Sequence, residues 1–219
     1  YNGYQSCWAI AILMALCGQL GRDGAGFTGI YLNTALALNT KGLWAAPGFK
    51  GMATTFPMTL LHDVVRDQEF AGKPYPLKAM VSILSNAMSN WPAQNNFIED
   101  ILPNIEFYLA MDTEMTDTAR HADMVLPTAS FYENEDFRKA HNLPYLVHQD
   151  KVIDPLYEAK DDIEIAGLIG RAMGFSDAFP EDWTFDDYAN LLLSGPAVEK
   201  AGITLERLRQ EQFIDLTVV

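Results

Sequence analysis

The sequence contains few of the residues that bind metal ions. Only two of its 219 residues are cysteine and four are histidine, and no CxxC or HxxxH pair occurs. The cysteines are Cys7 and Cys17, and the scattered histidines are His62, His121, His141 and His148. Because a protein metal site needs several such ligands at close spacing, we expect no self-contained metal site in this chain.

Long apolar segments are also absent. The longest apolar run, Cys7–Cys17, has 11 residues, whereas a helix that crosses a membrane needs about 20. The chain opens Tyr1-Asn2-Gly3, with no Met and no basic residue before that run. We therefore expect neither a signal peptide nor direct insertion into a membrane. A start without Met indicates a processed protein or a piece of a longer chain.

Positive charge is scarce, especially in the second half of the chain. The sequence has 15 Lys and Arg against 29 Asp and Glu, a formal net charge of −14. Residues 1–97 hold 6 basic and 4 acidic side chains, and residues 98–219 hold 9 basic and 25 acidic ones. Because nucleic-acid binding depends on clustered Lys and Arg, a nucleic-acid partner is not expected.

The pattern of apolar residues is typical of an α/β domain. Apolar runs at Ala79–Leu84, Ile105–Met111 and Met124–Leu126 predict strands, and they alternate with short helical segments such as Pro92–Leu102. Such alternation predicts parallel strands covered on both faces, a three-layer α/β/α sandwich with a mainly parallel, Rossmann-like sheet. Further elements are expected at Thr59–Arg66 (helix), Tyr145–Val152 (strand), and Ile163–Met173, Phe185–Leu193 and Leu205–Gln210 (helices).

The flanking segments complete the predicted organisation. Gln5–Leu20 is apolar nearly all round, which predicts a helix buried in a core and ended by the glycines of Gly21–Gly26. From there to Pro76, Gly and Pro recur without a GxGxxG or P-loop pattern, which predicts a wrapping segment. Tyr132–Asn142 is expected to be a polar loop. We treat 1–219 as a single α/β domain with three parts, namely 1–78, the nucleotide-binding core 79–175, and the helical extension 176–219.

Polar side chains follow the predicted strands, where ligands of open parallel sheets bind. Asp112 ends the second strand, with Thr116 four residues on, and Asn86 follows the first. An ionised Asp can accept two parallel hydrogen bonds from the N1–H and N2–H2 edge of guanine. The alternative, favoured by spacing alone, is that Asp112 starts a turn and Thr116 caps the next helix.

Two acidic clusters follow the third strand. Asp161 and Asp162 precede a predicted helix, where one can cap the helix start while the other faces a ligand. Glu133, Glu135 and Asp136 are candidates for a general acid or base, but a solvated acidic loop is the favoured interpretation.

The segment Asp112–Ala129, continuing to Tyr132–Glu135, resembles the molybdopterin oxidoreductase family, the group of dimethyl sulfoxide reductase, formate dehydrogenase and nitrate reductase. The stretch Ala11–Gly26 is similar to the family's helix and glycine turn. Glu158–Asp162, followed by the helix that ends at Arg171–Gly174, is similar to the stretch that comes next. The order and spacing of all three agree across about residues 1–175.

The resemblance implies one internal domain of a much longer catalytic subunit, from the periplasm or cytoplasm of a prokaryote. Such subunits hold molybdenum or tungsten between two molybdopterin guanine dinucleotides, and this domain would grip the guanosine part of one. The implied partners are an iron–sulfur electron-transfer subunit and the remaining domains of the same catalytic subunit. Any iron–sulfur cluster would lie outside this chain.

The family's cofactor-binding positions carry over to Asn86, Asp112, Asn134 and Asp162, and Thr116 joins the predicted cofactor-binding residues by its place four residues after Asp112. Asn90 is an alternative to Asn86, because Ser85-Asn86-Ala87 departs from the more common Gly-x-Asn-Pro form. No residue matches a metal ligand or a catalytic position, so the chain alone should be redox-inactive, supplying binding and orientation. Two alternatives stay open: a non-catalytic binding or assembly module of the same fold, and a non-redox, hydratase-like member of the family.

Overall fold

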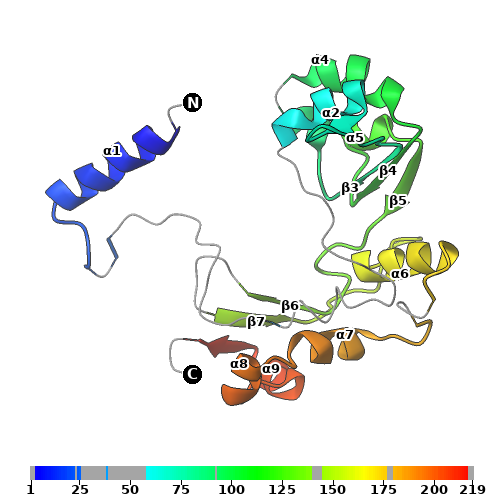
Figure 1. Ribbon diagram of the computed structural model, residues 1–219. Helices are drawn as coiled ribbons and strands as arrows, with labels where there is room; N and C mark the ends of the chain where they lie inside the picture. The colour runs from blue at the N-terminus through cyan, green and yellow to red at the C-terminus, as the bar shows by residue number, and fades with distance from the viewer. Residues whose placement is uncertain are drawn as a thin grey trace. The chain divides into compact units, whose positions relative to one another are not determined.

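The computed structural model describes most of the chain (Figure 1). The described residues are 3–22, 24–25, 38, 58–91, 93–139, 145–176 and 180–216. Contacts divide the chain into two compact units that are interleaved along the sequence. Unit 1 comprises Tyr1–Leu38, Phe137–His148 and Leu193–Val219, and unit 2 comprises Asn39–Asp136 and Gln149–Leu192. The single domain in three parts inferred from the sequence stays a prediction.

Unit 2 is built on a three-stranded parallel sheet. Its strands are β3 (Ala79–Ile83), β4 (Phe107–Asp112) and β5 (Met124–Pro127), in the order β3-β4-β5. The register pairs Ile83 with Met111 and Asp112 with Pro127, so the three strands end level with one another. The sequence predicted all three strands to within two residues. Their carboxyl ends therefore form one edge, where the polar residues singled out above follow.

Short helices cover one face of this sheet (Figure 1). The elements in chain order are η2 (Met58–Leu60), α2 (Leu61–Asp67), α3 (Ala87–Asn90), α4 (Gln94–Asn96), the π-helix η3 (Phe97–Ile101) and η4 (Leu102–Asn104). Their apolar side chains form a buried cluster that includes Val65, Met88, Phe97 and Tyr108 of β4. The predicted helix over Pro92–Leu102 is thus three short helices of different type, because Pro103 and the neighbouring turns interrupt a regular ladder.

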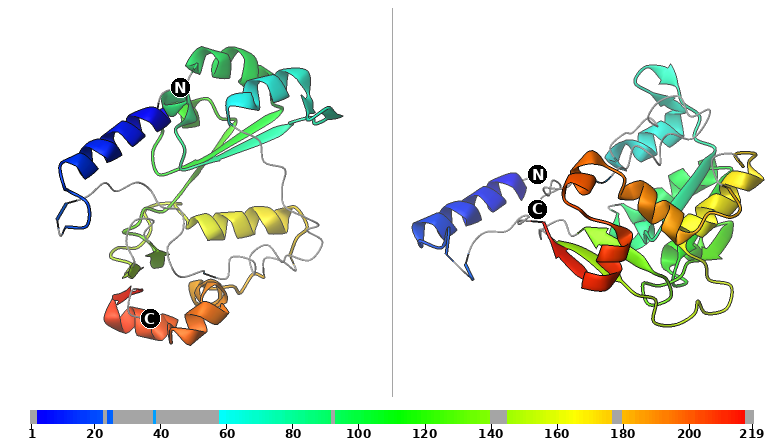
Figure 2. Two further views of the ribbon diagram at one scale, coloured as in Figure 1. Left: turned by 60° about the vertical axis from the view of Figure 1, so that its left-hand side comes forward. Right: turned by 90° about the horizontal axis from the view of Figure 1, so that it is seen from below.

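The opposite face is covered in part by α6 (Asp162–Ala172). Its Ile165 packs with Leu109 and Met111 of β4, and Leu126 and Ile169 lie against this cluster. Helices thus lie on both faces of the sheet, and Figure 2 shows the strands of unit 2 from two further sides. The predicted α/β class is confirmed. Two further helices complete the unit, α5 (Asp117–Arg120) and α7 (Phe185–Leu192), together with a small hairpin of β1 (Glu69–Phe70) and β2 (Lys73–Pro74).

Unit 1 contains a second, smaller sheet with the order β6-β7-β8. Its strands are β6 (Asp136–Lys139), β7 (Tyr145–Gln149) and β8 (Phe213–Asp215), and β7 pairs antiparallel with β8. The helices α8 (Pro196–Lys200) and α9 (Leu205–Glu211) lie between β7 and β8 in the chain. Leu146, Val198, Leu208 and Ile214 are fully buried.

Strand β6 contradicts the prediction of a polar loop over Tyr132–Asn142. Phe137 is the only apolar residue of the strand, and it is buried while Arg138 is exposed. One apolar residue in four is too weak an alternation to reveal a strand. Pairing with β7, its neighbour in the second sheet, decides the conformation instead.

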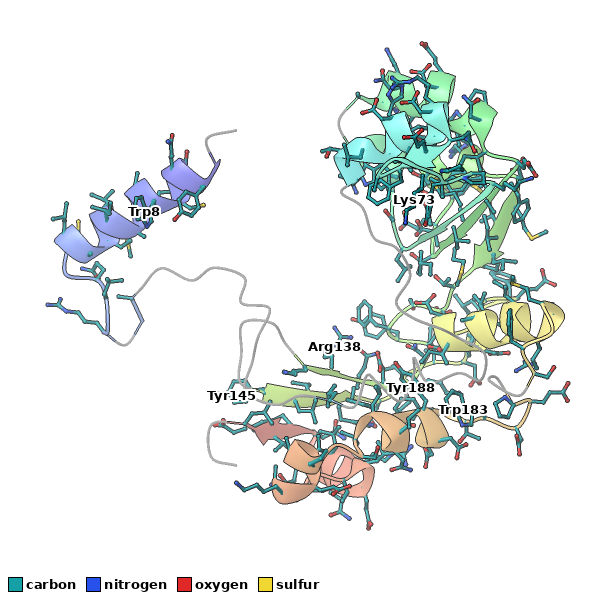
Figure 3. The ribbon with its side chains drawn as sticks, in the orientation of Figure 1. Trp8, Lys73, Arg138, Tyr145, Trp183 and Tyr188 are labelled. Atoms are coloured by element: carbon teal, nitrogen blue, oxygen red, sulfur yellow. The ribbon has the colours of Figure 1, made fainter. Side chains whose placement is uncertain are left out.

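The helix α1 (Gly3–Leu16) exists as predicted, but the prediction that it is buried is wrong. Its apolar side chains are exposed, with Trp8 (Figure 3) at 62% and Leu16 at 80%. It also ends earlier than the glycine turn Gly21–Gly26, because Gly18 adopts a left-handed φ of 65° and the N–H of Gln19 bonds back to Met14. Most of the predicted wrapping segment lies outside the described residues. Among the described helices, none is both long enough and apolar enough to cross a membrane.

Candidate functional site

The candidate site lies along the carboxyl ends of β3, β4 and β5. All five residues predicted to bind a cofactor belong to unit 2 and follow a strand or begin a helix there. They lie in two groups, one around the start of α5 and one around the start of α6.

Asp112 and Thr116 form the centre of the first group. The Asp112 Oδ1 accepts a hydrogen bond from the Thr113 N–H at 2.8 Å, and the Thr116 hydroxyl donates to Oδ2 at 3.5 Å. The same Thr116 oxygen accepts from the Ala119 N–H at 3.2 Å, so it caps α5. The structure therefore agrees with the alternative in which Asp112 begins a turn and Thr116 caps the next helix. The Asp112 Oδ2 can still accept a further hydrogen bond, because its contact with Thr116 is long for an O–H···O bond.

Asn86 joins this group from the end of β3. Its Oδ1 accepts from the Thr118 hydroxyl at 2.9 Å and from the Thr118 N–H at 3.3 Å. Because a backbone N–H requires an acceptor, these contacts fix which end of the amide is oxygen. The Asn86 amide nitrogen is then a hydrogen-bond donor on the turn that follows β3. Asn90, the alternative, is the last residue of α3 and is exposed.

The second group forms where the chain returns to the end of β5. Thr128 pairs with Lys160 in a parallel bridge, and the Ala129 N–H donates to the Lys160 carbonyl at 2.8 Å. This bridge brings the start of α6 to the same edge as Asp112. Asp161 caps α6, since its Oδ1 accepts from the Ile163 N–H at 2.8 Å, and its Oδ2 accepts from the Asn134 amide at 2.5 Å. The Asp161 carboxylate therefore caps α6, whereas the Asp162 carboxylate does not.

Three buried oxygen atoms near this bridge have no hydrogen-bond partner among the described residues. They are Thr128 Oγ1, Asn134 Oδ1 and Asp162 Oδ1. A buried polar atom without a partner is costly, and native proteins keep few of them. Three such oxygens near one sheet edge fit a ligand that donates hydrogen bonds. Thr128 was missed by sequence reasoning, although it directly follows a predicted strand and obeys the same rule as Asp112.

Asp162 carries the clearest electrostatic perturbation of the predicted residues. Burial raises the pKa of its carboxyl group, and the neighbouring Asp161 charge raises it further. The ionised form is therefore disfavoured in the folded protein without ligand. A donor that approached Oδ1 would relieve this penalty.

Asp162→Asn is expected to raise the Tm of the ligand-free protein at pH 7 by about 1–2 °C, a small gain because the group is only partly buried. Since the folded-state pKa is raised, the wild-type carboxylate lowers stability as pH rises above its ordinary value of 3.8. The gain should therefore shrink as pH falls toward that value. Thermal unfolding between pH 3.5 and 7 measures it, with exposed Asp182→Asn as the charge-matched control. An Asp162→Asn gain that persists undiminished at pH 3.5 would contradict this origin.

Glu133 has a structural role that neither sequence interpretation anticipated. It is buried at 6% exposure, and its two oxygens accept from the Ser130 N–H at 2.7 Å and the Leu156 N–H at 2.8 Å. These hydrogen bonds, chiefly that from Ser130, lower the pKa of the Glu133 carboxyl group. A carboxylate held ionised by backbone donors fastens the loop and is poorly suited to exchange protons near neutral pH.

A pocket of about 410 Å³ lies beside α6, and of the five predicted cofactor-binding residues Asn134 alone lines it. Its wall includes Asp161, Trp183 and Tyr188, of which the last two are labelled in Figure 3. Burial raises the pKa of the Tyr188 hydroxyl, with smaller contributions from the charges of Asp136 and Asp161. The other four predicted cofactor-binding residues do not line this pocket. The pocket therefore overlaps the candidate site only at Asn134.

Comparison with known proteins gives a consistent picture. A family model described as Molybdopterin oxidoreductase matches residues 1–171. A protein of Halobacterium salinarum, named as the catalytic subunit of a dimethyl sulfoxide reductase, is 31% identical over 179 residues, covering 78% of this chain and 20% of that protein. Trimethylamine-N-oxide reductase 1 of Escherichia coli is 28% identical, covering 82% of this chain and 24% of that protein.

Among solved structures, acetylene hydratase from Pelobacter acetylenicus is similar in fold and sequence. The match has a TM-score of 0.58 and 25% identity, and it covers 72% of this chain and 20% of the hydratase. The chain therefore spans only about a fifth to a quarter of the length of these relatives.

Proposed function

The chain belongs to the molybdopterin oxidoreductase family, and from this premise we propose that its unit 2 holds the guanosine part of a molybdopterin guanine dinucleotide. The family implies a molybdopterin cofactor with molybdenum or tungsten. The observation that carries the proposal is the set of acceptors along one edge of the parallel sheet. These are the Asp112 carboxylate and the three oxygens near β5 that have no partner among the described residues. These atoms fit a ligand rich in N–H and O–H donors.

Each residue would have a distinct role in binding. The Asp112 carboxylate would accept the paired N–H groups of guanine, and the Asn86 amide would donate to the guanine oxygen or ring nitrogen. Thr116 caps α5, and its hydroxyl lies 3.5 Å from the Asp112 Oδ2. Asp162, Thr128 and Asn134 offer acceptors to the hydroxyl groups of the ribose or the pterin. When bound, the metal supplies the oxygen-atom or electron-pair transfer, and these residues bind and orient the cofactor.

We further propose that this chain contributes no metal ligand of its own, and that the metal ligand and any iron–sulfur cluster belong to other parts of a longer protein. The short span relative to the matched relatives supports this division. The proposed partners are an iron–sulfur electron-transfer subunit and the remaining domains of the same catalytic subunit.

Isothermal calorimetry of the cofactor-free, full-length protein tests the guanine proposal. GDP is expected to bind at least about tenfold more tightly than ADP, because adenine presents an acceptor at N1 where guanine presents a donor, and Asp112 would then face an acceptor. Equal affinity for the two nucleotides would overturn the assignment of guanine to this edge. Metal analysis of the purified holoprotein in parallel shows whether molybdenum or tungsten is present.

A non-redox function is the second candidate, because acetylene hydratase shares the fold. The cofactor-binding residues would serve a hydratase equally well, since binding the dinucleotide does not determine the reaction. Turnover of a substrate without any electron donor or acceptor would favour the hydratase. Strict dependence on a reduced viologen dye would favour the reductase.

A further inference from the structure

The short helices α3 and α5 cap each other. Each is four residues long, and they follow β3 and β4, respectively, at the carboxyl edge of the sheet. The first N–H groups of a helix have no acceptor within that helix. Here the Thr118 hydroxyl of α5 accepts from the Met88 N–H of α3 at 3.0 Å, and the Asn86 Oδ1 accepts from the Thr118 N–H at 3.3 Å. A side chain at the start of each helix therefore satisfies an N–H group of the other.

Asn86 stands directly before α3, yet its side chain does not cap that helix. An asparagine at this position ordinarily accepts a hydrogen bond from the second or third N–H group of its own helix. In this structure the second N–H group, that of Met88, is already bonded to Thr118. The Asn86 oxygen turns to α5 instead, where the Thr118 hydroxyl donates to it at 2.9 Å in addition to the Thr118 N–H. The orientation of the Asn86 side chain is thus set by a residue 32 positions away in the sequence.

The directions of these hydrogen bonds follow from the chemistry of the groups. A backbone N–H can only donate, so the Thr118 oxygen accepts from Met88 and its own proton goes to Asn86. A half turn of the Asn86 amide would place its NH2 group against the Thr118 N–H, donor against donor. Thr118 is 1% exposed, so water does not replace the lost acceptor. The nitrogen of the Asn86 amide is therefore held on the side that faces away from Thr118.

We propose that Thr118 is a positioning residue for base recognition, which holds the Asn86 amide so that its nitrogen donates to the oxygen at position 6 of guanine. The inference rests on the cofactor proposal above and adds a second point at which the base is recognised. Guanine has an acceptor at position 6, where adenine has an amino group that donates. A fixed N–H donor therefore favours guanine and opposes adenine, independently of the Asp112 carboxylate at the other end of that edge.

Replacement of the Thr118 hydroxyl tests this role in the cofactor-free, full-length protein. Thr118→Val keeps the branched shape but leaves the Met88 N–H without its acceptor, and Asn86 can then turn back to cap its own helix. We expect the ratio of GDP affinity to ADP affinity, measured by calorimetry, to fall about 3- to 10-fold, the equivalent of one neutral hydrogen bond. Thr118→Ser keeps the hydroxyl and should restore the ratio to within about twofold of the wild type.

Two controls separate positioning from general damage. In an Asn86→Ala background, Thr118→Val should change the GDP to ADP ratio by less than about twofold, because the residue through which Thr118 acts is gone. Inosine diphosphate has the oxygen at position 6 but no amino group at position 2. Thr118→Val should therefore weaken its binding by the same factor as that of GDP. A loss that persists in the Asn86→Ala background would show that Thr118 acts by another route and would overturn the inference.

Asn86→Asp provides a test that leaves the buried Thr118 unchanged. Aspartate keeps an oxygen for Thr118 and presents a second oxygen, in place of the nitrogen, to the base. The GDP to ADP ratio should fall at least about tenfold, because a donor is replaced by a charged acceptor. The ratio compares two diphosphates, so the added charge affects both alike. An unchanged ratio would show that the Asn86 nitrogen does not recognise the base.

Hydrogen exchange without nucleotide reports the orientation of Asn86 directly. If Asn86 turns toward Met88 in Thr118→Val, the backbone amide of residue 118 loses its acceptor and should exchange at least about tenfold faster than in Thr118→Ser. Equal exchange in the two variants would overturn the positioning role. A wild-type preference for GDP that Thr118→Val retains in full would overturn this inference and leave the cofactor proposal standing. Equal binding of GDP and ADP by the wild type would overturn both.

Discussion

Asp112→Asn in the full-length protein is expected to weaken guanine-nucleotide binding about 10- to 150-fold, the equivalent of the 1.5–3 kcal/mol of a charge-assisted hydrogen bond. The Asp112 side chain presents two oxygens at the end of β4, one bonded to the Thr113 N–H and one approached only weakly by Thr116. Asparagine keeps the shape and can keep the first bond. It replaces the second acceptor by a donor, which then faces the donors of guanine.

The specificity of the loss distinguishes this role from general damage. Asp117→Asn removes the same charge at the first residue of α5. Among the bonds described, the Asp117 carboxylate accepts only an exposed hydrogen bond from Ser89 at 3.0 Å. We expect that control to bind guanine nucleotides within about twofold of the wild type. Calorimetry with GDP and ADP separates the cases. An Asp112→Asn protein that binds GDP normally, or that loses GDP and ADP equally, would show that Asp112 does not recognise guanine.

Phe97→Ala is expected to lower the free energy of unfolding by about 3–5 kcal/mol, the usual result of removing a buried aromatic ring. Phe97 is 3% exposed, and its ring centroid lies 5.7 Å from that of Trp91 and 6.1 Å from that of Tyr108. These edge-to-face and tilted contacts add to the apolar area that the ring buries. Because Tyr108 belongs to β4, the cavity would loosen the strand that carries Asp112.

The neighbouring residue supplies a matched control. Ile98 lies on the same π-helix but is exposed, so Ile98→Ala should change stability by less than about 1 kcal/mol. Urea unfolding followed by far-UV circular dichroism measures both variants. Similar losses for Phe97→Ala and Ile98→Ala would mean that the cluster beneath the sheet is not the core of unit 2.

Local sequence patterns were sufficient to predict the conformation of segments that contain a continuous apolar run or a helix cap. The strands at Ala79–Ile83 and Phe107–Asp112 are continuous apolar runs, and α6 combines an aspartate cap with apolar residues at helical spacing. Such segments adopt the same conformation in many folds, because burial and capping act within a few residues. The strand β6 and the helix α3 lack such a signal. They depend on pairing with β7 and on packing in the buried cluster of unit 2, respectively.

The candidate site likewise combines residues that the sequence predicted with details that only the structure shows. Strand-end position alone singled out Asp112 and Asn86, since the carboxyl ends of parallel strands meet at one edge. The sequence could not tell which of Asp161 and Asp162 caps α6, because both are chemically able to do so. The structure assigns the cap to Asp161 and leaves the Asp162 oxygen buried without a partner among the described residues.

By itself the sequence determined the α/β class, the order of the main strands and helices, and the family, because these follow from local periodicity and from a long specific motif. Only the tertiary structure decided that α1 is exposed, that Glu133 fastens a loop, and that Thr128 joins Asp162 at one edge. It alone also showed that the helices α3 and α5 cap each other. Burial and hydrogen-bond satisfaction are properties of which distant segments meet, and no local pattern of residues records that.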